Sequence, residues 1–310
     1  MTESTTNDLD EQDPEVEEPS PFRIALGFFI LPLLLVIGGI SIFLMFGVLA
    51  HEDVNPADYL PEINGRGINE PWQAAFHLSQ QLQFNDELHG DEDFARQVVD
   101  SMNKADDGDP RIRRFLAVAL GRIGHAAAVP TLVAHLDDED TEVMVNSLWA
   151  LGTIGDPAAA DAVAERLQSD DGDVRTMAAY VLGALQAPST AAPLRVALND
   201  PIPAVSWNSA VALGMMNDAA GAALLTRMID RDFLASVPGV MESDHSTTML
   251  AALAALEQLG QPGLDEQLTT LQNSDPDPRV RDAARKALAA ARAQEQNELA
   301  AVPDVGRWLT

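Results

Sequence analysis

The feature that most constrains the fold of this chain is a Leu-Gly dipeptide that recurs every 31 residues, at Leu120, Leu151, Leu182 and Leu213. Apolar or small residues also recur zero, four and seven positions after a reference residue that lies eight positions before each leucine. The four reference residues are Ile112, Val143, Val174 and Val205. Because these offsets lie on one face of an α-helix, each unit is predicted to contain a helix with one packed face. A fixed period of this length indicates stacked repeats.

A second apolar segment follows each of these helices after a short turn, at residues 129–136, 160–167, 192–198 and 222–229. Asp109, Asp140 and Asp171 stand where the first helices of three units begin, which is the position of an N-cap residue. One helical hairpin cannot bury its apolar stripe alone, whereas stacked hairpins share a continuous core. The predicted fold class is therefore all-α, an α-solenoid of helical hairpins over residues 107–292.

The glycine of each Leu-Gly dipeptide lies inside a predicted helix, at Gly121, Gly152, Gly183 and Gly214. Glycine in a helix interior costs about 1 kcal/mol relative to alanine. That cost is understandable if each glycine marks a close contact between neighbouring helices, whose axes can then approach toward the short end of about 8–10 Å. We therefore predict that these four glycines are structural.

The segments that flank the array depart from its pattern. Residues 69–106 lack the Leu-Gly dipeptide and are predicted to form an atypical capping hairpin, preceded by a Pro- and Gly-containing spacer at 51–68. The step from Leu213 to Leu256 is 43 residues, which indicates an insertion of about 12 residues within 231–247. Two further units follow the insertion, and residues 293–310 are predicted to be a C-terminal tail.

The N-terminal part of the chain is predicted to be a disordered acidic tail over residues 1–22, followed by an apolar segment. Residues 24–50 carry no charge and would form a helix of about 40 Å, longer than the roughly 30 Å core of a bilayer. We therefore predict a single-pass transmembrane helix over 23–50, and a cleaved signal peptide is the alternative. Arg23 favours an N-terminus on the inside and an extracytoplasmic repeat domain.

The charge of the chain limits its partners. The net charge is −29, and the first 20 residues carry eight acids and no base, so that a nucleic-acid partner is not expected. A basic protein would be attracted, although an acidic surface that is poor in lysine is also typical of adaptation to salt. The absence of cysteine removes disulfides and thiolate chemistry.

The pattern V-R-x-x-A-x-x-A-L-G resembles HEAT repeats of the phycobilisome-lyase type, and Val174-Arg175, Ala178 and Leu182-Gly183 match it best. The resemblance covers about six units and implies the α-solenoid fold. Two enzyme groups share this fold: bilin lyases, and a deoxyhypusine hydroxylase whose di-iron site uses repeated His-Glu pairs. Here the His-Glu pair is His51-Glu52, outside the array, and a fold resemblance alone does not carry an activity.

No catalytic or metal-binding motif stands out in the sequence. The six histidines, His51, His77, His89, His125, His135 and His245, show no ligand spacing of a familiar metal site. The Asp-rich runs at 106–109 and 170–173 lack the distal Glu of a calcium loop, and their position favours helix capping over calcium binding. We therefore expect no enzyme activity, no cofactor and no small-molecule substrate.

We predict a membrane-anchored scaffold that presents an acidic curved surface to a protein partner, such as a membrane complex. The alternatives are a bilin-lyase-like or other chromophore-handling protein and a metal-binding sensor that uses the Asp-rich turns. Two surfaces are candidates for partner binding: the face of the second helices and the insertion. Their candidate residues are His135, Glu165, Arg166, Arg195 and Arg227 on the first surface, and Met241, Glu242, Asp244 and His245 on the second.

Overall fold

A computed structural model describes residues 31–49, 55–66, 70–105 and 108–301 of the chain. The chain divides into two compact units, residues 1–54 and residues 55–310. No strand occurs in the described residues, so the predicted all-α class is confirmed there.

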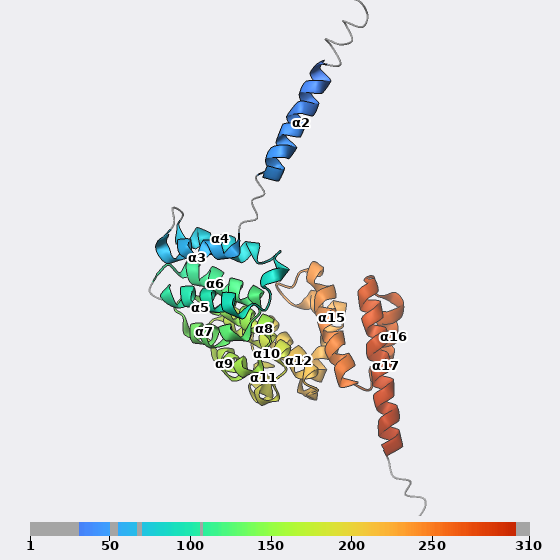
Figure 1. Ribbon diagram of the computed structural model, residues 1–310. Helices are drawn as coiled ribbons and strands as arrows, with labels where there is room; N and C mark the ends of the chain where they lie inside the picture. Colours follow the sequence, from blue (N-terminus) through green and yellow to red (C-terminus); the bar gives the residue numbers. More distant parts are fainter. Residues whose placement is uncertain (1–30, 50–54, 67–69, 106–107, 302–310) are drawn as a thin grey trace, which may run out of the picture. The chain divides into compact units, whose positions relative to one another are not determined.

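In the first unit, the structure describes one helix, α2 (Leu31–Leu49), which has 19 residues (Figure 1). At about 1.5 Å per residue this helix measures about 28 Å. Among the described residues, no helix combines the length and the apolar character that crossing a bilayer requires. This finding overturns the predicted single-pass localisation, with its transmembrane helix over 23–50 and its extracytoplasmic repeat domain. The predicted acidic tail at 1–22 lies outside the described residues.

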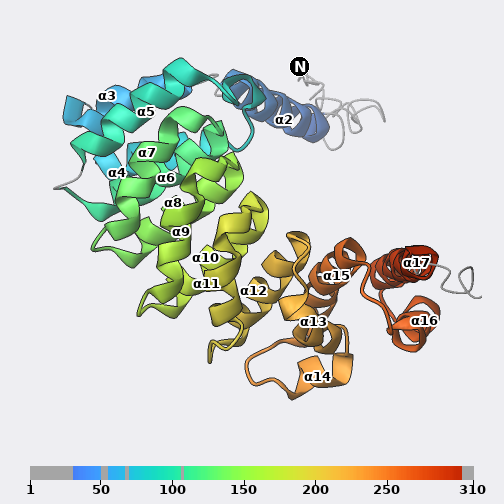
Figure 2. The same cartoon turned by 90° about the horizontal axis from the view of Figure 1, so that it is seen from below.

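The second unit is a curved row of helical hairpins in which each first helix packs against the first helix of the next hairpin (Figure 2). The first helices are α4 (Pro71–Gln81), α6 (Pro110–Ile123), α8 (Thr141–Ile154), α10 (Gly172–Leu185), α12 (Pro203–Met215), α15 (Glu242–Leu259) and α17 (Pro278–Ala301). The second helices are α5 (Glu92–Lys104), α7 (Val129–Ala134), α9 (Ala160–Glu165), α11 (Ala191–Ala197), α13 (Ala222–Met228) and α16 (Asp265–Ser274). Short 3-10 helices lie in the turns between helices, for example η6 (His135–Asp137) and η8 (Arg166–Gln168).

The predicted packed face of the first helices is confirmed. The four Leu-Gly leucines and the residues four and seven positions after the reference residues are all buried, as are three of the reference residues, and Ile112 is half-buried. Each helix therefore contributes one stripe to a core that continues from unit to unit, as expected for hairpins that cannot bury their apolar residues alone.

The predicted N-caps are confirmed as well. The side chains of Asp109, Asp140 and Asp171 accept hydrogen bonds from backbone amides in the first turns of α6, α8 and α10. Asp171 accepts from the amides of both Asp173 (2.8 Å) and Val174 (3.3 Å). The Asp-rich turn at 170–173 therefore caps a helix, and the described residues contain no cluster of three or more acidic or histidine side chains that could hold a metal ion. Asp106 and Asp107 lie outside the described residues.

We expect the Asp171→Ala variant to lose about 1 kcal/mol of unfolding free energy, because the amides of Asp173 and Val174 lose their acceptor. Asp171→Asn keeps a side-chain oxygen and serves as the control. Urea unfolding followed by circular dichroism measures both variants. A loss in the Asn variant equal to that in the Ala variant would mean that charge, and not capping, is what Asp171 supplies.

The structure differs from the prediction in the segments that flank the regular repeats. The predicted spacer contains η2 (Pro56–Asp58), α3 (Tyr59–Pro61) and η3 (Glu62–Arg66), whose Leu60 and Ile63 are buried in the same core. The predicted insertion contains α14 (Arg231–Ser236) and the first residues of α15. The predicted C-terminal tail begins inside α17. In the first two segments apolar residues are buried in the core, such as Leu60, Ile63 and Leu234, although the 31-residue period does not extend to them.

Each repeat glycine faces a residue of the next unit, the one seven positions after that unit's reference residue. A Cβ atom added at Gly121 would lie 2.9 Å from the Cα atom of Ala150, and one added at Gly152 would lie 2.9 Å from Cγ2 of Val181. At Gly214 the nearest atom, Cβ of Ala255, would be 2.7 Å away. The predicted close contact is therefore found at three positions. At Gly183 the added Cβ would meet Ala212 at 3.4 Å, an ordinary van der Waals distance.

Candidate partner-binding groove

Two of the junctions between regular units contain a largely buried ion pair. The Nε and Nη2 atoms of Arg113 donate to the two carboxylate oxygens of Asp138 at 2.7 and 3.0 Å, and those of Arg175 donate to Asp200 at 2.8 and 3.3 Å. In both pairs the aspartate follows the arginine by 25 residues and lies in the turn before the next first helix. The Nη1 atom of each arginine donates to carbonyl oxygens of the turn before its own helix. Each arginine therefore holds the turns of two successive units together.

The unit between these two has neither member of the pair. Met144 stands at the position of the arginine and Ser169 at the position of the aspartate. The Oγ atom of Ser169 still accepts a hydrogen bond from the amide of Asp171 at 3.2 Å, as Asp138 does from Asp140 at 2.9 Å. The chain thus contains both a charged and an uncharged version of the same junction.

The charged junction makes stability depend on pH. Burial raises the pKa of Asp200, but hydrogen bonds from Arg175 and from the amide of Ile202 outweigh it and lower the pKa below its ordinary 3.8. The folded-state pKa is thus below that of the unfolded chain, so the carboxylate stabilises the fold above the unfolded-state pKa, and this contribution disappears as the pH falls through the folded-state pKa.

We therefore expect the difference in unfolding free energy between the wild type and Asp200→Asn to be largest near neutral pH and to shrink as the pH falls below about 4. Urea denaturation of both proteins across this pH range gives the difference directly. Comparing the two proteins cancels the change in overall charge repulsion, which is otherwise large for a chain of net charge −29. A difference that stays constant at all pH values would contradict the lowered pKa of Asp200 in the folded protein.

Where the array is irregular, the arginine of this junction comes from the start of α14 instead of from a first helix. Ser206 stands at the arginine position of the fourth unit, and Arg231, 25 residues later, stands at the aspartate position. Arg231 donates to both carboxylate oxygens of Asp275, at 2.8 Å each, and this carboxylate belongs to the turn before α17. The arginine therefore reaches forward across the inserted residues to a turn 44 residues away.

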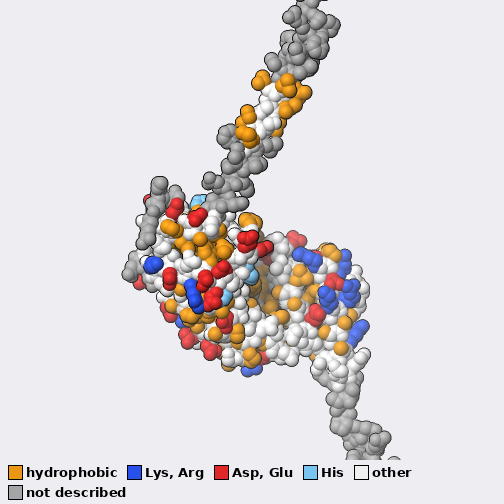
Figure 3. Space-filling view, in the orientation of Figure 1, with side chains coloured by type: hydrophobic (Ala, Val, Ile, Leu, Met, Phe, Trp, Pro, Cys, Tyr) orange, Lys and Arg blue, Asp and Glu red, His pale blue; other side chains and the backbone are white. Residues whose placement is uncertain are grey.

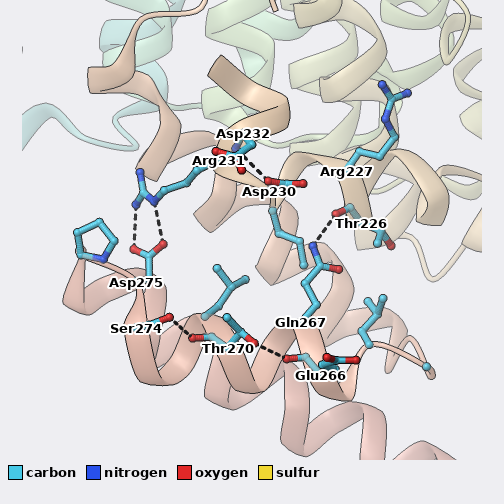
Figure 4. A pocket seen from close by; sticks show the side chains of 15 residues that line it. Thr226, Arg227, Asp230, Arg231, Asp232, Glu266, Gln267, Thr270, Ser274 and Asp275 are labelled. Atoms are coloured by element: carbon cyan, nitrogen blue, oxygen red, sulfur yellow. Dashed lines mark hydrogen bonds and ion pairs between the residues drawn. The ribbon is translucent and has the colours of Figure 1, made fainter. Parts of the chain in front are cut away.

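A groove with a volume of about 850 Å³ lies at this irregular step, and we call it the α13–α16 groove (Figure 4). One wall comes from the end of α13 and the start of α14, and the other comes from α16 and the residues on either side of it. Two contacts bridge the walls: the Arg231–Asp275 pair, and a hydrogen bond of 3.2 Å from the Nε2 atom of Gln267 to the carbonyl oxygen of Thr226. These contacts hold the walls at a set separation and leave the space beside them open.

The charges in the α13–α16 groove are mostly negative. Asp230, Asp232 and Glu266 line it, and no ion pair of these three carboxylates is found in the described part of the chain. The positive charge of Arg231 is neutralised by Asp275, and Arg227 stacks on the ring of Phe233 at 4.2 Å. The guanidinium of Arg227 points away from the α16 wall in Figure 4.

Positive charge gathers elsewhere, over the C-terminal part of the array (Figure 3). The residues involved on α17 are Arg279, Arg281, Arg285, Lys286 and Arg292. Much of this charge is already paired: Arg279 with Asp277 at 2.8 Å, Lys286 with Asp282 at 3.1 Å and Arg292 with Asp265 at 2.8 Å. This surface is therefore a less suitable binding site than the α13–α16 groove.

Of the candidate residues on the second helices, Arg227 alone lines the described α13–α16 groove. Glu165 and Arg195 are exposed on the neighbouring units, and Arg195 bonds to Asp218. Arg166 is half-buried and donates to the carbonyl oxygen of Leu136 at 3.1 Å. His135 is only 7% exposed, and its Nδ1 atom bonds to the carbonyl oxygen of Thr131 at 2.8 Å, so burial removes it as a surface contact.

The candidates in the insertion lie outside the lining of the groove. Met241, Glu242 and Asp244 are exposed at the start of α15. His245 is 5% exposed, and its Nε2 atom has no hydrogen-bond partner in the described part of the chain. As with His135, burial excludes it from a surface contact. The prediction of a binding surface in the insertion placed all four residues at the surface. In the helix that they form, some side chains point inward.

Sequence reasoning missed most of the residues that line the α13–α16 groove, such as Asp230, Asp232, Glu266 and Gln267. A signal was present: the 25-residue spacing of Arg113 to Asp138 and of Arg175 to Asp200 places Arg231 where an aspartate is expected. An arginine at this position indicates that the junction is formed by different residues from those of the regular units.

The row of helical hairpins, each joined to the next through its first helix and its turns, defines a helical-repeat protein. A family model of HEAT repeats matches residues 102–183 and, overlapping them, 164–238. No curated protein matches the sequence. The complex of CpcE and CpcF of phycocyanin lyase from Nostoc sp. PCC7120 is similar in structure, with 17% identity and a TM-score of 0.52 over 79% of this chain and 94% of that one.

An engineered protein is similar to the same degree, with 20% identity and a TM-score of 0.52 over 76% of this chain and 68% of that one. At such identities the likeness establishes the repeat fold and carries no activity. The resemblance to HEAT repeats stated from the sequence is confirmed over the residues that the family model matches, 102–238.

Proposed function

We propose that this protein is a HEAT-repeat scaffold that binds a partner protein in the α13–α16 groove. The observation that carries the proposal is the Arg231–Asp275 pair, which takes the place of the regular arginine junction and bridges the two walls of the groove. Elsewhere the array repeats one junction, and its exposed candidate residues are scattered over several units. Solenoids present extended surfaces for partners, and insertions in them tend to carry function.

Site-specific crosslinking in the organism's own cells tests this proposal. A photo-crosslinking residue replaces Thr270, which lines the groove, or Tyr180, which is 59% exposed on α10 and outside the groove. We expect one protein to be captured from Thr270 and not from Tyr180. Equal capture from both positions, or no capture from Thr270, contradicts a partner site in the groove.

A second candidate function is the handling of a chromophore. The structural likeness to the phycocyanin lyase complex and a groove volume within the range of small-molecule sites favour it. Titration of the full-length protein with a linear tetrapyrrole, followed by absorption spectroscopy, separates the two functions. A saturable spectral change that Thr270→Trp abolishes would favour chromophore binding over the scaffold.

A further inference from the structure

We infer that the α13–α16 groove takes a short basic segment of the partner, with an Arg or Lys side chain placed between Asp230 and Asp232 on one wall and Glu266 on the other. The inference rests on the proposed function and specifies the chemistry of the partner. Its basis is the balance of charges in the groove together with the apolar surface beside them.

Three carboxylates of the groove have no ion pair in the described part of the chain: Asp230, Asp232 and Glu266. Asp230 and Asp232 lie at the junction of α13 and α14, and Glu266 lies in the first turn of α16, on the other side of the groove in Figure 4. The positive charges nearby are already engaged, since Arg231 forms its ion pair with Asp275 and Arg227 stacks on Phe233. A guanidinium or ammonium group entering the groove would therefore meet complementary charge from both walls.

The position of one carboxylate is set by the backbone. An Oδ1 atom of Asp230 accepts a hydrogen bond of 2.9 Å from the amide of Asp232, because Asp230 caps α14. For its second oxygen, Oδ2, no hydrogen bond is found in the described part of the chain. A carboxylate held in this way loses little side-chain entropy when it binds a cation, which is the condition under which a partly exposed ion pair adds affinity.

The groove also offers apolar surface for the stem of a basic side chain. Ile229 is buried beneath it, and Leu264 and Leu271 are half-buried along the α16 wall. Arg and Lys bury their methylene stems along such surface while the charged group stays near polar atoms. An acidic segment would instead face the three carboxylates Asp230, Asp232 and Glu266, and like charges repel.

The test uses the full-length protein and a fluorescein-labelled peptide of about twelve residues that alternates Arg, Leu and Gly, with Glu and Gln versions as controls. Fluorescence anisotropy measures the dissociation constant. We expect the Arg peptide to bind, and the double variant Asp232→Asn, Glu266→Gln to bind it about tenfold more weakly. The matched control is Asp173→Asn, Glu257→Gln, which removes two exposed carboxylates from outside the groove and changes the net charge equally.

The control protein is expected to bind within about twofold of the wild type. Equal weakening in both double variants would assign the binding to the overall charge of −29 and overturn the inference, as would equal binding of the Gln peptide or no binding of the Arg peptide. Crosslinking from Thr270 distinguishes the two proposals: a partner captured there through a segment without Arg or Lys leaves the scaffold function standing and refutes the basic segment.

Discussion

Replacing Arg113 by Met is expected to destabilise the array by about 3–5 kcal/mol, because it leaves the carboxylate of Asp138 buried without its cation. The side chains of Arg113 and Asp138 are 9% and 7% exposed, and the aspartate receives two hydrogen bonds from the guanidinium. The single variant Asp138→Ser is also expected to be destabilised, since the guanidinium then loses its carboxylate partner.

The double variant Arg113→Met, Asp138→Ser provides the control that the chain itself suggests. It installs the pair found at Met144 and Ser169, where the serine hydroxyl still accepts the amide hydrogen bond of the turn. We expect the double variant to lose much less stability than the sum of the two single variants, measured by urea unfolding. Additive losses would show that the pair has no coupling energy and that the junction does not depend on it.

Replacing Gly121 by Ala is expected to destabilise the array, whereas the same change at Gly183 is expected to leave it unchanged or to stabilise it. The new methyl at Gly121 would lie 2.9 Å from the Cα atom of Ala150, so that α8 must shift, at a cost of about 1–3 kcal/mol. At Gly183 the nearest atom of Ala212 is 3.4 Å away, and the change gains helix propensity of up to about 1 kcal/mol.

Thermal unfolding of the two variants next to the wild type measures this difference. The two glycines stand at the same position of their repeats and are both inside a helix, so each is a control for the other. If both variants melt at lower temperature to the same extent, the close helix contact is not what distinguishes them.

Much of the fold was predictable because it rests on local periodicity. The offsets of zero, four, seven and eight place residues on one face of a helix whatever lies around it, and all four Leu-Gly leucines are buried. Asp109, Asp140 and Asp171 cap their helices because an N-cap acts on amides two or three residues away. The close contact at Gly121 followed from the cost that a helical glycine carries.

The prediction of a transmembrane helix was wrong. It rested on the composition of residues 24–50 and on the assumption that the whole run forms one helix. The described helix α2 has 19 residues, and the described part of the chain has no helix that meets the requirements for crossing a membrane. Composition indicates that a segment is apolar, but it does not by itself establish a helix that meets those requirements.

By itself, the sequence determined the class of fold, the positions of the helices in the regular units and the capping of their first turns, because each depends on residues within one or two helical turns. The tertiary structure alone decided that Leu60 and Ile63 join the core, that His135 and His245 are buried, and that Arg231 pairs with Asp275 across 44 residues. The α13–α16 groove belongs to this second group. Its walls come from segments whose distance depends on how two hairpins stack, and no local pattern encodes that distance.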